Sequence, residues 1–166
     1  MTTTELLAAY SNGNVEVSLY GDGTKVREWP DGQIPIPAFP ESVDIKITNY
    51  CDAGCGWCHE QSTTAGNHAP LAVVDRVLSS FPAGVEFAIG GGNPLAHPDF
   101  LAILAGIRER GQFANLTVNQ FHVERAETVD LLNRLHRKRL VHGIGVSFLT
   151  LRGVLKALEL ESPNVV

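Results

Sequence analysis

From residue 43 onward, short runs in which apolar and polar residues alternate are each followed by a longer segment whose apolar residues recur with helical periodicity. The alternating runs predict strands at 43–48, 85–89, 115–119 and 142–148. The helical segments carry apolar residues three and four positions apart and predict helices near 70–81, 98–110, 124–138 and 151–160. Four consecutive βα units predict an α/β fold, in which helices pack on at least one face of a parallel sheet.

The first 40 residues have a different pattern. Apolar and polar residues alternate over 15–19, and after a glycine-containing break residues 24–29 can return antiparallel, which predicts an N-terminal β-hairpin. Four prolines follow between Pro30 and Pro40, and because proline fixes φ and lacks an amide hydrogen, this segment is predicted to be an extended linker. The expected domains are therefore a hairpin and linker at 1–40 and an α/β core at 41–166.

The predicted parallel strands have one apolar and one polar face. In each strand one set of alternate residues is apolar, whereas the other set is polar or small. Parallel sheets that are covered on both faces usually consist of continuous Val, Ile and Leu runs, so the polar face needs an explanation. A barrel lumen that holds a polar ligand provides one, and a sheet with one solvated face is the alternative. On the polar face we expect Lys46 and Glu86 to form an ion pair between neighbouring strands.

Composition and charge narrow the class of protein. With 44% hydrophobic and 19% charged residues, the chain has the composition of a globular protein. No apolar run reaches the roughly 20 residues of a membrane span, and the N-terminus lacks the basic flank of a secretory signal. We therefore expect a soluble cytoplasmic protein with no membrane partner. A net charge of -5 gives no electrostatic reason to bind nucleic acid.

All three cysteines, Cys51, Cys55 and Cys58, lie directly after the first predicted parallel strand. An odd, tightly spaced set in this context argues against disulfides and favours a metal or cluster. Three thiolates at C-x3-C-x2-C spacing can hold three irons of a cubane cluster and leave the fourth iron open. Zinc is the alternative, with His59 or His68 as the fourth ligand.

Two segments carry a resemblance to a known family. CDAGCGWC, after a strand that ends in ITNY, resembles the cluster motif of the radical S-adenosylmethionine (radical SAM) superfamily, including the aromatic residue before the last cysteine. IGGGNPLAHPDF, at the end of the next strand, resembles that superfamily's Gly-Gly-Glu-Pro segment. Asn93 stands in place of the usual glutamate. We expect weaker S-adenosylmethionine binding as a result, because a neutral amide lacks the charge assistance of a carboxylate.

The resemblance implies a partial (β/α) barrel of radical SAM type with about four βα units, whose chemistry lies at the carboxyl ends of the strands. Cys51, Cys55 and Cys58 would hold a [4Fe-4S] cluster whose open iron binds S-adenosylmethionine. An electron delivered to the cluster would then cleave S-adenosylmethionine to methionine and a 5'-deoxyadenosyl radical, which abstracts hydrogen from a substrate. The sequence does not identify that substrate, and the family implies a flavodoxin- or ferredoxin-type electron donor.

The resemblance also implies cofactor-binding residues outside the cysteine loop. Gly91, Gly92 and Asn93 would lie beside the methionine amino group. Ser147, at the end of the fourth strand, matches a position where the family often contacts the ribose. Asn119, at the end of the third strand, is a further candidate for contact with cofactor or substrate.

The family's usual barrel has six βα units, whereas here a fifth strand would begin only near 162–166. We therefore expect a shortened barrel, whose last strand leaves an open edge available for association. Three hypotheses about function follow. The chain is a radical SAM enzyme or its catalytic core, a non-catalytic iron-sulfur fragment or subunit that needs another chain to complete the barrel, or a zinc-stabilised α/β scaffold.

Overall fold

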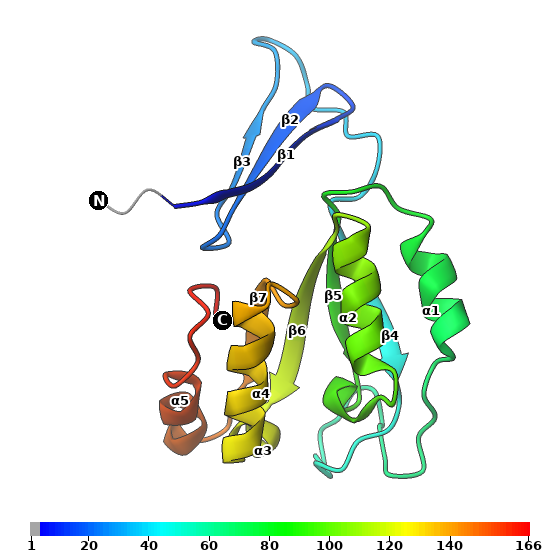
Figure 1. Ribbon diagram of the computed structural model, residues 1–166, viewed down its shortest axis with the longest axis vertical. Coiled ribbons are helices and arrows are strands. Elements are labelled where there is room, and N and C mark those ends of the chain that lie inside the picture. The colour runs from blue at the N-terminus through cyan, green and yellow to red at the C-terminus, as the bar shows by residue number, and fades with distance from the viewer. Residues whose placement is uncertain (1–3) are drawn as a thin grey trace.

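The computed structural model describes residues 4–166, which form two β-sheets (Figure 1). The N-terminal sheet is antiparallel with the order β1 (Leu6–Asn12), β2 (Val15–Tyr20) and β3 (Lys25–Glu28). The predicted hairpin is confirmed as β2 and β3. The sequence did not predict β1, because apolar residues follow one another at its start and a register shift between Leu6 and Ala8 interrupts its alternation.

The second sheet is parallel and contains four strands in sequence order. They are β4 (Ser42–Thr48), β5 (Glu86–Gly91), β6 (Phe113–Asn119) and β7 (Gly143–Ser147). This sheet confirms the predicted α/β fold with four parallel strands. Beyond β7, Val165 forms a parallel bridge with Ile144, so the last residues of the chain continue the pairing of the sheet.

Helices connect the parallel strands. The four predicted helices are present as α1 (Leu71–Leu78), α2 (Phe100–Glu109), α4 (Ala126–Arg137) and α5 (Leu151–Ala157). Two short elements, η1 (Pro94–Ala96) and α3 (Gln120–Val123), were not predicted because each is too short to show a helical period. Within residues 4–166, no helix has both the length and the apolar character needed to cross a bilayer.

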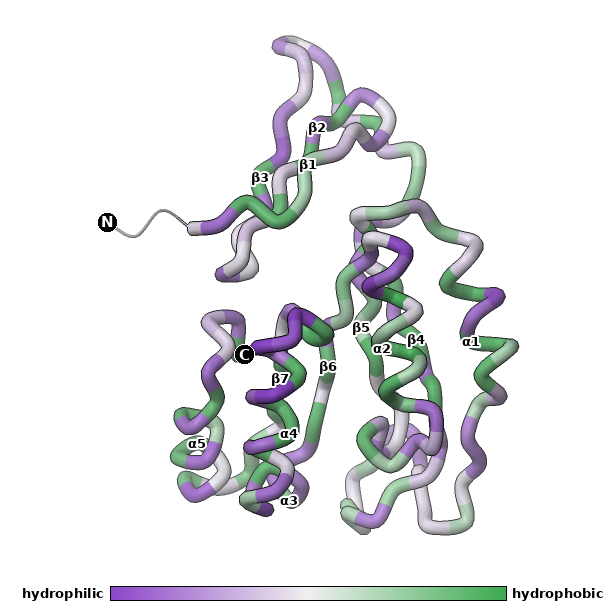
Figure 2. The backbone as a smooth tube through the Cα atoms, viewed as in Figure 1, coloured by the Kyte–Doolittle hydropathy of each residue, from purple (hydrophilic) through white to green (hydrophobic). Residues whose placement is uncertain are grey.

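The helices pack on the apolar face of the parallel sheet, in front of it in Figure 1. Phe87, Leu116 and Ile144 of the strands are fully buried, as are Leu104 of α2 and Leu132 of α4. Each such side chain contributes about 1.5 to 3 kcal/mol relative to an exposed position. Figure 2 shows hydrophobic residues interspersed with hydrophilic ones along these strands and helices.

The other face of the sheet is polar and open to solvent. Its exposed residues include Asp44, Lys46, Thr117 and Ser147. The sequence analysis assigned these side chains to one face correctly. The predicted pair of Lys46 and Glu86 is wrong, because β4 and β5 align Ser42 with Glu86 and so place Lys46 at the opposite end of the strand.

Both residues have other partners. Lys46 pairs with Glu60 of the loop after β4, and Glu86 pairs with Lys25 of β3. The Lys25 ammonium also lies 3.4 Å from the Glu41 carboxylate, so this cluster joins the N-terminal sheet to the amino ends of the parallel strands. Residues 29–41 contain neither helix nor strand. A separate N-terminal domain that ends near residue 40 stays a prediction.

His142, just before β7, makes stability depend on pH. Its imidazole is buried in edge contact with the Phe113 ring, with 5.5 Å between the ring centroids. This burial lowers the pKa of His142, although the nearby Glu86 carboxylate opposes the shift. The unfolded chain therefore binds the proton more readily, so the contribution to stability is complete above the unfolded pKa of about 6.5 and is lost as pH falls toward the folded pKa.

We therefore expect the free energy of unfolding to decrease between about pH 7.5 and pH 5.5, as measured by urea denaturation of the metal-free protein. His142→Phe should show a shallower dependence over this range, because phenylalanine has no proton to bind. The variant His59→Ala is the control for the loss of an imidazole, since the His59 side chain is 91% exposed. Equal slopes for wild type and His142→Phe would contradict the prediction.

Candidate functional site

The loop that contains the cysteines leaves the carboxyl end of β4 and is fixed by backbone hydrogen bonds. Cys51 N donates to Thr63 O at 3.0 Å, and Cys58 N donates to Cys55 O at 3.2 Å. All three thiols are free and partly exposed. The sequence between β4 and α1 therefore folds into a tethered loop that presents three reactive sulfur atoms at one edge of the sheet.

The environment differs among the thiols. The backbone amide of Ser62, with those of Glu60 and Gln61, lowers the pKa of Cys58. Burial raises the pKa of Cys51, and the neighbouring Asp52 carboxylate adds to that effect. Because the thiolate is the form that binds metals, the amides around Cys58 favour ligation at that position, whereas burial disfavours the thiolate of Cys51.

The distances between the cysteine sulfur atoms help to distinguish a cluster from a single zinc ion. Among residues 4–166, the one set of three Cys, His, Asp or Glu side chains with ligand atoms within 4.8 Å of one another is Cys51, Asp52 and His122. The three cysteines are therefore spread wider than ligands of one tetrahedral zinc, whose sulfurs lie about 3.8 Å apart at a Zn–S distance of about 2.3 Å. Neither alternative zinc ligand belongs to that set: His68 bonds Thr48 Oγ1 through Nδ1 at 2.9 Å, and the His59 side chain is exposed.

The glycines at the end of β5 allow this strand to pass close to the start of the cysteine loop. Gly91 has a φ of +110°, and a Cβ there would lie 2.2 Å from Thr48 O. A Cβ at Gly92 would lie 2.1 Å from Tyr50 O. In this close approach Gly92 N donates to Thr48 O at 2.9 Å and Asn93 N donates to Tyr50 O at 2.6 Å. The predicted Gly91, Gly92 and Asn93 thus lie beside Cys51.

The two remaining predicted residues lie at the same edge of the sheet. Asn119 and Ser147 are paired residues at the ends of β6 and β7. Asn119 Nδ2 donates to Cys55 Sγ at 3.5 Å, and its Oδ1 accepts from Phe121 N at 3.0 Å at the start of α3. Ser147 is exposed, and its side chain makes no hydrogen bond within the described part of the chain. Sequence and structure therefore place all the predicted site residues around one edge.

Asp52 is a functional candidate that the sequence analysis missed. Its Oδ1 accepts from His122 Nε2 at 2.8 Å and from Asn93 Nδ2 at 3.1 Å, and its Oδ2 accepts from Arg125 Nη2 at 3.1 Å. Burial alone would raise the pKa of Asp52, but the hydrogen bonds from His122, Arg125 and Asn93 outweigh it and hold the pKa well below its usual range. Asp52 is therefore an ionised carboxylate that ties the cysteine loop to β5 and to the segment of α3.

The family of the chain is consistent with this geometry. The family model of the Radical SAM superfamily matches residues 45–152, well over half of the chain. The chain belongs to the radical SAM superfamily. The match runs from β4 to the start of α5 and includes every predicted site residue. No curated protein sequence matches the chain significantly. Membership in the radical SAM superfamily supports an iron-sulfur and S-adenosylmethionine type of function.

The residues of the site fit the cofactors that radical SAM proteins use. Three soft thiol ligands without a fourth cysteine suit a cubane cluster with one open iron. Space around them is available, because a Cβ added at Gly54, Gly56 or Gly90 would meet no other atom within 4 Å. The donor set and the open surroundings therefore accommodate a cluster and a small molecule beside it.

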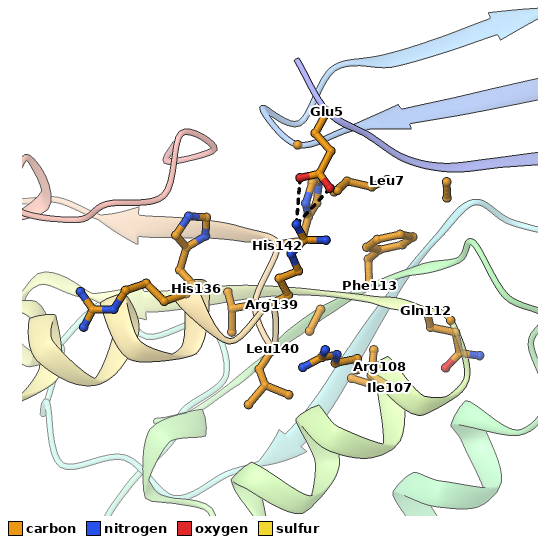
Figure 3. Close-up of a pocket in the computed structure, with 16 residues that line it drawn as sticks. Glu5, Leu7, Ile107, Arg108, Gln112, Phe113, His136, Arg139, Leu140 and His142 are labelled. Carbon is orange, nitrogen blue, oxygen red and sulfur yellow. Dashed lines mark hydrogen bonds and ion pairs between the residues drawn. The ribbon is translucent and has the colours of Figure 1, made fainter. Parts of the chain in front are cut away.

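A separate cavity of about 530 Å³ lies at the opposite end of the parallel sheet (Figure 3). It is bounded by β1 and by the amino ends of β6 and β7, and its lining includes Glu5, Arg108, Phe113, Arg139 and His142. Arg139 pairs with Glu5 across it at 3.0 Å. None of the cysteines or other predicted site residues lines this cavity.

Proposed function

We propose that this chain is a radical SAM enzyme or the catalytic core of one, which cleaves S-adenosylmethionine reductively. Cys51, Cys55 and Cys58 bind a [4Fe-4S] cluster in this proposal. The observation that carries it is the set of three free thiols beside the glycine turn at 90–92, at the carboxyl edge of the sheet in a radical SAM chain. When bound, the cluster and S-adenosylmethionine supply a 5'-deoxyadenosyl radical that abstracts hydrogen from the substrate.

The residues around the thiols have a supporting role in this proposal. Asn119 donates to Cys55 Sγ, and the backbone amides of residues 60–62 stabilise the Cys58 thiolate. Hydrogen bonds of this kind to ligand sulfur reduce its negative charge and tune the reduction potential of a cluster. We infer that Asn119 acts on the cluster through Cys55.

The binding of S-adenosylmethionine is assigned to the edge formed by β5, β6 and β7. Gly90 leaves open space at this edge, because a Cβ there would meet no other atom within 4 Å, and the Ser147 hydroxyl is available to hydrogen-bond a ribose. We place the substrate over the polar face of the sheet, where Asp44, Lys46 and Thr117 are exposed. A cytoplasmic location and a flavodoxin- or ferredoxin-type electron donor complete the proposal.

A second candidate function has a specific observation in its favour. Leu151 and Leu155 of α5 and Leu158, the residue that ends the helix, lie along one side of it and are 73%, 56% and 77% exposed. An apolar stripe of this size next to the last paired strand is typical of a surface that another protein segment covers. It favours an iron-sulfur subunit that needs another chain to complete the barrel.

Anaerobic reconstitution with iron and sulfide tests these functions. For the enzyme we expect about four irons per chain and, after addition of S-adenosylmethionine and dithionite, formation of 5'-deoxyadenosine. A cluster that reduces fully but yields no 5'-deoxyadenosine would contradict catalysis by this chain and favour the subunit. Iron-free protein with one zinc per chain would contradict both functions.

A further inference from the structure

The cavity between β1 and the amino ends of β6 and β7 has the size and the apolar walls of a small-molecule site. Its volume of about 530 Å³ lies within the range of about 300 to 1,000 Å³ that is typical of such sites. Leu7, Phe113 and Leu140 line it and are half-buried. The cavity can therefore enclose the apolar or aromatic body of a small molecule.

The charge of the cavity lining differs from that of the whole chain. The chain has a net charge of -5, whereas the lining contains three arginines, Arg108, Arg137 and Arg139, and only one acidic residue, Glu5. An excess of positive charge in a concave site attracts anions. The lining therefore favours a ligand that carries a negative charge.

Interactions at the helix ends account for two of these arginines. A cation near the C-terminus of a helix is stabilised by the helix dipole, and Arg108 Nη1 donates to Lys138 O at 2.6 Å at the end of α4. Arg137 pairs with Glu161 at 2.6 Å. Arg139 instead reaches from the end of α4 to Glu5, in the segment before β1 (Figure 3).

Arg139 also occupies a backbone position that usually holds glycine. Its φ is +55°, in the left-handed region. Arg139 N donates to His136 O at 2.8 Å, and Leu140 N donates to Leu135 O at 2.9 Å. These two bonds form a Schellman motif, in which the left-handed residue after the helix cap is most often glycine. An arginine at this position is therefore less stable than a glycine would be.

The ion pair with Glu5 does not explain why arginine stands there. The Arg139 and Glu5 side chains are 66% and 59% exposed, and exposed ion pairs contribute little to stability. An unfavourable backbone conformation without a gain in stability points to a function of the side chain. That side chain is the guanidinium at the rim of the cavity.

The Glu5 carboxylate shows where an anionic group can bind. Both of its oxygens accept from Arg139 Nη2, at 3.0 and 3.1 Å. The other N–H groups of Arg139 have no acceptor within residues 4–166. A guanidinium presents five N–H donors in a planar fork that fits a phosphate or a carboxylate. Arg139 can therefore bind a second anion beside Glu5 or in its place.

We propose that the cavity binds a small organic anion. Its phosphate or carboxylate group bonds the Arg139 guanidinium, and its apolar or aromatic body contacts Phe113 and Leu140. Glu5 competes with the ligand for Arg139. This site is at the opposite end of the sheet from the cysteines, so the inference goes beyond the proposed function and does not depend on a cluster.

Isothermal titration calorimetry of the full chain tests this site with phenyl phosphate, phenylacetate, benzyl alcohol and inorganic phosphate. We expect at least one of the two aromatic anions to bind about tenfold or more tightly than neutral benzyl alcohol, because hydrogen bonds between charged groups are stronger. That anion should also bind more tightly than inorganic phosphate, which has no apolar body to bury. The better of the two aromatic anions shows whether the natural ligand is a phosphate ester or a carboxylate. If neither binds more tightly than benzyl alcohol, or if inorganic phosphate binds equally well, the proposal is overturned.

Two substitutions with opposite expected effects make the test specific. Arg139→Gly should weaken binding of the aromatic anion about tenfold or more, whereas its urea midpoint should not fall below that of wild type, because glycine suits the left-handed position. Glu5→Gln should strengthen binding, because it removes the competing carboxylate. The matched control is Arg152→Gln, which removes an exposed arginine that pairs with Glu124 outside the cavity and should bind like wild type. Unchanged binding by Arg139→Gly, or weaker binding by Glu5→Gln, would overturn the proposal. If Arg139→Gly does not fold, Glu5→Gln decides.

Discussion

Replacement of Cys55 by serine is expected to abolish cluster assembly. After anaerobic reconstitution, wild type should hold about four irons per chain, whereas Cys55→Ser should hold less than about one. A serine hydroxyl ionises far less readily than a thiol and is a poor ligand for the soft iron-sulfur core. The two thiols that remain cannot hold three irons. Iron analysis and the visible absorbance of the cluster measure the effect.

His59→Ala is the control that separates cluster from zinc. His59 lies directly after Cys58 and would be a zinc ligand in the alternative Cys3His site, but its side chain is exposed and bonded to no cysteine. We expect this variant to bind iron like wild type. Full iron content in Cys55→Ser would show that the ligand assignment is wrong, and loss of bound zinc in His59→Ala would favour the scaffold.

Most of the parallel sheet could be predicted because its signals are local. The alternating pattern of β5 and β6 spans only a few residues, and so do the apolar stripes of α2 and α4. The sequence alone therefore indicates whether each element is a strand or a helix, and in which order the elements follow one another. Elements without a clean period were missed. β1 contains a register shift, and α3 has four residues, so neither repeats a pattern often enough to be detected.

The candidate site also contains parts that the sequence could predict and contacts that it could not. The cysteine loop and the glycine turn are contiguous motifs, and their proximity follows from the position of each at the carboxyl end of a neighbouring strand. The contact of Asp52 with His122 joins residues 70 positions apart, and only the folded chain brings them together. A signal was present, since both residues follow strands of one sheet. Alternation shows on which face of the sheet a side chain lies, but it does not show which residues of neighbouring strands are aligned. For this reason the predicted ion pair between Lys46 and Glu86 was wrong.

The glycine turn is a backbone position near the site that should not tolerate a side chain. Gly91 combines a φ of +110°, which L residues rarely adopt, with a missing Cβ that would otherwise lie 2.2 Å from Thr48 O. The contact is with backbone rather than with the end of a flexible side chain. An alanine there can fit only if β5 moves away from β4, and that movement would break the hydrogen bond from Gly92 N to Thr48 O.

We therefore expect Gly91→Ala to lower the free energy of unfolding by about 3 kcal/mol or more, as measured by urea denaturation of the metal-free protein. Gly90→Ala is the matched control. It is the preceding residue of β5, and a Cβ there would meet no other atom within 4 Å, so its stability should stay within about 1 kcal/mol of wild type. Similar losses in both variants would show that the close approach of β5 to Thr48 does not determine the requirement for glycine. A loss confined to Gly91→Ala would show that the positive φ and the close approach to Thr48 O together require glycine at this position.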